Sequence, residues 1–196
     1  MRPWYIFALI VTLLLLAINI IAVPIFKSKT EHHLPVHKTL YLDRNLSAYE
    51  FAMIAGAAWE WHLATNNMVT FDIERLPSKH IISHESIIVC LVSSDFPEII
   101  ELDVEDPSAS HMAYYYKYGT LPYIGIVSER ISEKDYRPVI LHELGHALGL
   151  KHNEGIDGIG TLMYPNIDLG ATTITDTDLK NFCKLYDCDA SKLHDQ

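Results

Sequence analysis

The sequence predicts an α+β fold, a twisted mixed β-sheet with helices packed on it, followed by a small C-terminal helical subdomain. Strand-like runs of apolar or alternating residues recur between residues 40 and 127. Apolar residues with helical spacing occur at 47–64, 138–148 and 175–186. Once an apolar N-terminal segment is set aside, about 165 residues remain, which is enough for one sizeable hydrophobic core.

The first 29 residues (1–29) predict a single-pass transmembrane anchor. No charge occurs from Trp4 to Phe26, and as a helix this stretch would span about 34 Å, slightly more than a hydrocarbon core of about 30 Å. A cleaved signal peptide is the alternative, but its apolar region is usually only about 7–15 residues long and ends at an Ala-x-Ala-like site, which is not evident here. By the positive-inside rule, Arg2 before this stretch and Lys27 and Lys29 after it favour a cytoplasmic domain.

Residues 30–38 are predicted to form a polar linker, and residues 39–196 the folded domain. The first expected strand is Leu40–Leu42. Ser47 and Glu50, three apart, form a capping box that predicts the start of a long helix, and this helix is expected to end near Thr65.

Four further strands are predicted in the middle of the chain. Val69–Ile73 alternates in polarity, and Ile87–Val92 is a continuous apolar run suited to the centre of a sheet. Residues 112–118 and 123–127 flank a turn, as in a β-hairpin. Between the Ile87–Val92 run and residue 112, the acidic loop from Ser93 to Ser110 offers oxygen ligands for Ca²⁺, but its spacing matches no calcium-binding motif.

The acidity of the chain argues against nucleic-acid binding. The formal net charge is −10, and because the three charges before Thr30 are all positive, the remainder carries −13. An acidic domain repels phosphate backbones, and no basic stripe follows Lys38. A solvated surface accounts for the acidity, with a preference for basic substrates as the alternative.

A last helix is predicted from the cap formed by Thr175 and Asp178, with Phe182 and Cys183 on its apolar face. Cys183 and Cys188 lie five apart at its end and can form a disulfide in an oxidising compartment. Three cysteines in total provide no disulfide framework, so free thiols are expected.

The segment from His142 to His152 reads His-Glu-x-x-His-x-x-Gly-x-x-His and predicts a zinc site. His142 and His146 are four apart, so on a helix they share one face, where two neutral imidazoles can bind one ion. Glu143 lies beside them. It is the candidate general base, able to take a proton from a zinc-bound water.

The third ligand, His152, can reach the same ion only if the helix ends first, because six more helical residues would carry it about 9 Å along the axis. Gly149 provides the end, since glycine adopts the left-handed conformation at little cost. The helix is therefore expected from Pro138 to Leu148. Three histidines leave a fourth position open, which is typical of catalytic zinc sites.

Together with Leu162-Met163-Tyr164-Pro165, this motif resembles the metzincin clan of zinc endopeptidases, and most of all its matrixin family. The resemblance implies an upper subdomain with the sheet, a small lower subdomain, and a cleft between them beside an edge strand that pairs with extended peptides. Such domains usually work outside the cytoplasm, against the orientation that the flanking charges favour. It also implies zinc ligands at His142, His146 and His152, a catalytic base at Glu143, and Met163 in a turn beneath the metal.

The expected activity is hydrolysis of peptide bonds in a protein or peptide substrate by a zinc-dependent endopeptidase with one catalytic Zn²⁺. Two alternatives stay open. One is a non-catalytic, zinc-stabilised peptide-binding module, against which the intact Glu143 weighs. The other is a zinc hydrolase of a non-peptide amide, because a metal and a base do the same chemistry on both substrates.

Overall fold

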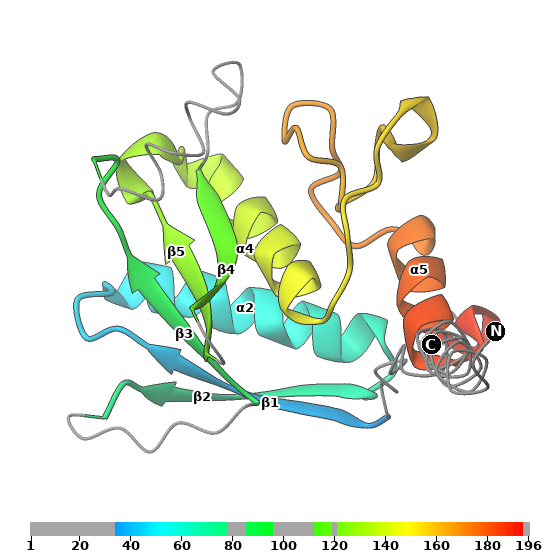
Figure 1. Ribbon diagram of the computed structural model, residues 1–196, viewed down its shortest axis with the longest axis horizontal. Helices are drawn as coiled ribbons and strands as arrows, with labels where there is room; N and C mark the ends of the chain where they lie inside the picture. The colour runs from blue at the N-terminus through cyan, green and yellow to red at the C-terminus, as the bar shows by residue number, and fades with distance from the viewer. Residues whose placement is uncertain (1–33, 78–84, 96–111, 119–120, 194–196) are drawn as a thin grey trace, which may run out of the picture. The chain divides into compact units, whose positions relative to one another are not determined.

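A mixed β-sheet forms the centre of the computed structural model, which describes residues 34–77, 85–95, 112–118 and 121–193 (Figure 1). The strand order within this part of the chain is β2-β1-β3-β5-β4. All neighbouring strands run parallel except β4 and β5, which form an antiparallel pair and leave β4 at the edge. The strands are β1 (Val36–Leu42), β2 (Val69–Arg75), β3 (Ser86–Leu91), β4 (Ala113–Tyr118) and β5 (Leu121–Ile126).

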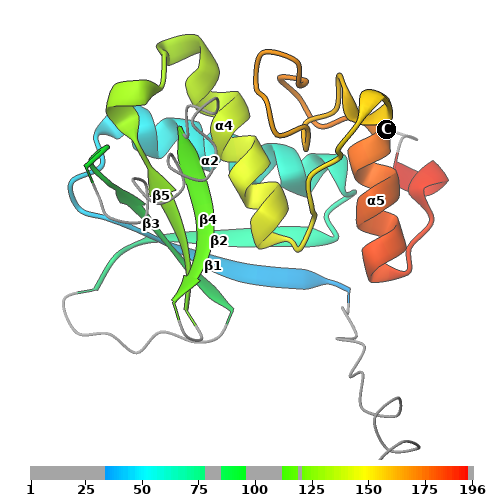
Figure 2. The ribbon, with the colours of Figure 1, turned by 45° about the horizontal axis from the view of Figure 1, so that its top comes forward.

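Three α-helices complete the described part of the fold. Figures 1 and 2 show α2 (Ala48–Ala64) and α4 (Glu133–Ala147) against the sheet, with α5 (Asp176–Tyr186) beyond the C-terminal end of α4. An irregular segment joins α4 to α5. Short 3-10 helices occur at η1 (Ser128–Arg130), η2 (Ile156–Gly158) and η3 (Ala190–Leu193). The predicted α+β fold with a C-terminal helical part is confirmed.

The long helix α2 begins where its capping box predicts. The Ser47 side chain accepts a hydrogen bond from the Glu50 amide at 3.2 Å, and the Ser47 amide donates to the Glu50 carboxylate at 2.7 Å. Trp61, which is fully buried near the end of the helix, donates from Nε1 to the Leu141 carbonyl at 2.9 Å. This bond joins α2 to the helix that carries the histidine motif.

Two elements start earlier than predicted. Helix α4 begins at Glu133, so Pro138, the predicted start, lies inside the helix, more than one turn beyond its observed start. The start lies after Ser132, whose carbonyl accepts from the amide of Tyr136 at 3.1 Å and opens the helix. Strand β1 begins at Val36 and so includes the last three residues of the predicted linker, because Val36 is buried and its amide donates to the Met68 carbonyl at 2.8 Å.

The prediction of free thiols at the end of the last helix is wrong. Cys183 and Cys188 form a disulfide with their Cα atoms 4.4 Å apart. Asp187 has a left-handed backbone with φ of 56°, which ends α5 and turns the chain back toward Cys183. A count of cysteines carries no information on such a turn. Cys90, in β3, keeps its thiol.

The structure also corrects the predicted membrane localisation. Within residues 34–77, 85–95, 112–118 and 121–193, no helix has the length and apolar character needed to cross a bilayer. The stretch from Trp4 to Phe26, on which that prediction depended, lies outside the described residues.

Candidate metal centre

Helix α4 places the first two histidines of the motif side by side. The ring centroids of His142 and His146 lie 4.7 Å apart, as expected for residues separated by one helical turn. Each ring is oriented by a hydrogen bond from Nδ1 to a backbone carbonyl, that of Leu162 at 2.7 Å and that of Leu150 at 2.9 Å. A carbonyl only accepts, so both Nδ1 atoms carry the proton and both Nε2 atoms present lone pairs.

The helix ends at Gly149, as predicted. Gly149 has φ of 90°, and its amide donates to the His146 carbonyl at 2.8 Å. The next amide, that of Leu150, donates to the Gly145 carbonyl at 3.0 Å. These two bonds form a Schellman motif, which stops the helix and reverses the chain. The turn brings His152 back to the face that carries His142 and His146.

The three histidines converge through their Nε2 atoms. Nε2 of His152 lies 3.1 Å from that of His142 and 3.0 Å from that of His146. Two of these nitrogens present lone pairs, so the single proton that a neutral His152 ring can place on Nε2 serves only one of the two contacts. A bound cation satisfies all three, since ligands at about 2.1 Å around a tetrahedral zinc ion lie about 3.4 Å apart. The residues therefore fit a metal ion, and within the described part of the chain they form the one group of His, Cys, Asp or Glu close enough to hold it.

The environment keeps the histidines in the neutral form that binds metals. Burial, followed by the neighbouring His146 ring, lowers the pKa of His142 to about 3. Burial also lowers the pKa of His146 and of His152, although the carboxylate of Glu154 partly opposes the shift at His152. Neutral imidazoles offer a lone pair without first losing a proton, so little is lost when they bind zinc.

Glu143 lies on α4 between the two helical histidines and is almost fully buried, with 5% of its surface exposed. Its Oε2 has no hydrogen-bond partner within the described residues. Burial raises the pKa of this carboxyl to about 8. A buried carboxyl oxygen without a hydrogen bond destabilises the folded state unless a ligand or substrate group supplies the missing bond. Such groups are typical of functional sites.

Met163 packs against the same helix at Gly145. It is fully buried, and a Cβ atom on Gly145 would lie only 2.4 Å from its Sδ. Gly145 is therefore needed for the close approach of the Met163 turn to α4. The predicted place of Met163 in a turn next to the histidines is thus the one observed.

Sequence reasoning missed the polar cluster that holds this turn, although Asp178 had been identified as part of a helix cap. Asp178 is fully buried and accepts hydrogen bonds from the amides of Leu162 at 3.0 Å and Met163 at 3.2 Å. It also accepts from the amide of Thr175 at 2.9 Å and from the Thr175 hydroxyl at 2.6 Å. The Thr-x-x-Asp spacing was the available signal, but it indicates only the cap.

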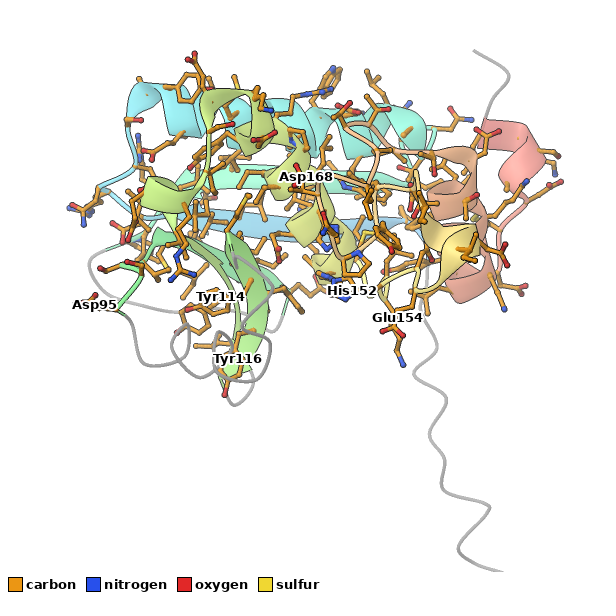
Figure 3. All side chains as sticks on the ribbon, turned by 90° about the horizontal axis from the view of Figure 1, so that it is seen from above. Asp95, Tyr114, Tyr116, His152, Glu154 and Asp168 are labelled. Atoms are coloured by element: carbon orange, nitrogen blue, oxygen red, sulfur yellow. A yellow bond between two sulfur atoms is a disulfide. The ribbon has the colours of Figure 1, made fainter. Side chains whose placement is uncertain are left out.

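The edge strand β4 carries three consecutive tyrosines near the centre. Tyr114 covers Gly125 of β5, where a Cβ atom would lie 2.3 Å from the tyrosine ring. Tyr116 is exposed. Figure 3 shows both on β4, with His152 and Glu154 on the segment after α4. Of the acidic loop considered for calcium, residues 96–110 lie outside the described residues.

Solved structures share this fold. The chain is similar to archaemetzincin from Methanopyrus kandleri, with a TM-score of 0.50, 13% identity, and coverage of 84% of this chain and 99% of that one. It is also similar to the hatching enzyme zinc-protease HCE-1 from the medaka fish Oryzias latipes, with a TM-score of 0.49, 15% identity, and coverage of 83% and 97%. The fold is metzincin-like.

The particular family follows from the sequence profile. The profile described as Matrixin matches residues 57–187, which is well over half of the chain and includes the whole metal centre. The chain therefore belongs to the matrixin family. The comparison with curated proteins found no match.

Proposed function

We propose that the chain is a zinc-dependent endopeptidase in which His142, His146 and His152 hold the metal and Glu143 is the general base. One observation carries the proposal: three Nε2 atoms converge next to α4, and Glu143, adjacent to His142 on this helix, is a buried carboxyl whose Oε2 has no partner within the described residues. When bound, zinc supplies a Lewis acid that lowers the pKa of water and polarises a carbonyl group.

The residues of the chain then have distinct tasks. The positive charge of a zinc ion held by the histidines would favour the carboxylate form of Glu143 despite its burial. Oε2 of Glu143 would then accept a proton from the attacking water and pass it to the nitrogen of the leaving amine, so the C–N bond breaks with no net proton gained or lost by the enzyme. The carbonyls of Leu162 and Leu150 keep His142 and His146 in the tautomer that presents Nε2 to the metal.

The edge strand supports an extended peptide as the substrate. Strand β4 pairs with β5 on one side only, within the described sheet, so main-chain groups on its other side can pair with a peptide. Pairing along the middle of a chain does not require a terminus, which favours internal cleavage.

The test compares the parent protein with Glu143→Ala on a peptide library, each with zinc and after removal of zinc. We expect the parent to cut internal bonds only with zinc, and the variant to lose about 10²–10⁴-fold in rate because the proton carrier is gone. Zinc content, measured by atomic absorption, should stay at the parent level in the variant because the histidines are intact.

The outcomes separate the competing functions. Parent-like hydrolysis by zinc-loaded Glu143→Ala would show that the base is misassigned. Peptide binding by the parent without any cleavage would favour the non-catalytic binding module. Cleavage of small non-peptide amides but not of peptides would favour the other hydrolase.

A further inference from the structure

The three candidate ligands differ in how their rings are held. His142 and His146 lie on α4, and each donates from Nδ1 to a backbone carbonyl. His152 is exposed and lies in irregular backbone, and within the described residues its Nδ1 makes no hydrogen bond, since its ring contacts are through Nε2. The position of His152 must therefore be set by the residues next to it in the chain.

Asn153, the next residue, forms hydrogen bonds through its backbone amide and through both polar atoms of its side chain. Its amide N–H donates to the Met163 carbonyl at 2.8 Å. Its side-chain Nδ2 donates to the Thr161 hydroxyl at 3.1 Å and to Oδ1 of Asp178 at 3.3 Å. Its Oδ1 accepts from Nδ2 of Asn181 at 2.8 Å. Asn153 is thus joined both to the Met163 turn and to α5.

The direction of these bonds is forced. Oδ1 of Asp178 accepts a hydrogen bond from the Met163 amide, so it faces Asn153 as an acceptor, and the Asn153 amide turns its NH₂ group toward Asp178 and its oxygen toward Asn181. That oxygen needs a donor, and Asn181 supplies one. Reversing the Asn153 amide would place its oxygen against the Asp178 carboxylate. Asp178 and Asn181, both on α5, therefore hold the side chain of the residue that follows His152 in one orientation.

We infer that Asn181 is a positioning residue for the metal centre, acting through Asn153 on His152. The inference depends on the proposed function, because it assigns His152 as a ligand. By this inference α5, which contributes no ligand itself, helps to hold the third histidine in place. In a metal site with only three protein ligands, a loose third ligand weakens the whole site, and partners of ligands typically contribute about 10–100-fold to metal affinity.

The experiment measures metal binding by the purified full chain. Zinc affinity is determined by competition with a chromophoric chelator, and the ligand field is read from the visible absorption of the cobalt-loaded protein. We expect Asn181→Ala to raise the zinc Kd about 10-fold or more. Asn181→Asp, of equal size, should raise it further because a carboxylate oxygen then faces Oδ1 of Asn153. Both should change the cobalt spectrum.

Two control variants separate positioning from general stability. Ser47→Ala removes the capping box of α2 and lowers stability far from α5. Lys180→Ala changes an exposed residue next to Asn181 on the same helix. Both should keep the zinc Kd and the cobalt spectrum of the parent, whatever they do to the unfolding temperature.

A parent-like zinc Kd and cobalt spectrum in Asn181→Ala would overturn the inference, even if Asn181→Asp fails to fold. An equal loss of affinity in Ser47→Ala would also overturn it, because general stability would then explain the effect. These measurements do not use hydrolysis. A parent that binds zinc but cuts no peptide contradicts the proposed endopeptidase, and the role of Asn181 is still decided by the affinities.

Discussion

Helix α4 and the segment between Leu150 and Thr175 hold their parts of the centre by different means. In α4, the helical repeat puts His142 and His146 on one face, and one Schellman motif ends the helix. The following segment contains a single short helical turn, η2, among its described residues. Its shape comes from backbone turns together with side chains that bond to the backbone and to α5. Spacing along the sequence therefore specifies the first region, and contacts between distant residues specify the second.

Asp178 offers the strongest test of that difference. One buried carboxylate accepts from Leu162 and Met163 in the turn and from the start of α5, and within the described residues it has no cation as a partner. If the segment between Leu150 and Thr175 depends on the Asp178 side chain, removal of this carboxylate should unfold the segment. The regular hydrogen bonds of α4 should survive longer.

Asp178→Asn is expected to lower the free energy of unfolding by about 3 kcal/mol, because an NH₂ group replaces an oxygen that accepts from backbone amides, and each buried donor left unpaired costs about 1–3 kcal/mol. Urea unfolding measures the loss. Hydrogen exchange should show faster opening of the Leu162 and Met163 amides than of amides in α4.

A matched variant is Asp176→Asn, which makes the same chemical change two residues earlier, at an exposed position in the first turn of α5. It removes a favourable interaction of a carboxylate with the helix dipole, worth about 0.3–1 kcal/mol. Equal losses in the two variants would contradict the view that Asp178 holds the segment.

The same difference explains what the sequence could predict. The capping boxes at Ser47 and Thr175, the end of α4 at Gly149 and the histidine triad all follow from residues a few positions apart. The structure shows the caps and the helix end where they are predicted, and it brings the three histidines together. The bond between Asn153 and Asn181 joins residues 28 positions apart. Two polar residues at that distance have no pattern that distinguishes them from other surface residues. The start of α4 was misplaced for a related reason, because Pro138 is equally acceptable as a first residue and its tolerance further inside depends on the surroundings.

Removal of the disulfide tests how much the C-terminal end of α5, which contacts α4, contributes to stability. Tyr186, within the disulfide loop, donates to the Leu148 carbonyl at 2.9 Å and so touches the end of α4. Cys188→Ser should lower the free energy of unfolding by about 2 kcal/mol, the chain-entropy value for so short a loop. Urea unfolding without reductant measures it. Dithiothreitol should reproduce the loss in the parent and leave the variant unchanged; a parent insensitive to reductant would contradict a stabilising disulfide.

The smallest expected effect concerns Asp187, which occupies the left-handed position after α5 with φ of 56°. Glycine is unstrained there, and removing a carboxylate from a helix C-terminus relieves repulsion with the helix dipole. Against this, glycine gives the unfolded chain more freedom, at a cost of about 0.4–1 kcal/mol. The net expectation for Asp187→Gly is a gain of about 0.5 kcal/mol in urea unfolding.

Asp187→Asn and Asp187→Val divide this gain into its causes. Asparagine keeps the backbone preference and removes only the charge, so it should give a part of the gain, whereas valine at positive φ should lose about 1–2 kcal/mol. None of the three should alter the zinc Kd, because Asp187 lies more than one helical turn beyond Asn181 and makes no hydrogen bond to the segment that carries His152 within the described residues. A change in zinc affinity with Asp187→Gly would mean that strain at the end of α5 reaches the metal centre, and that the two regions are less separate than their hydrogen bonds indicate.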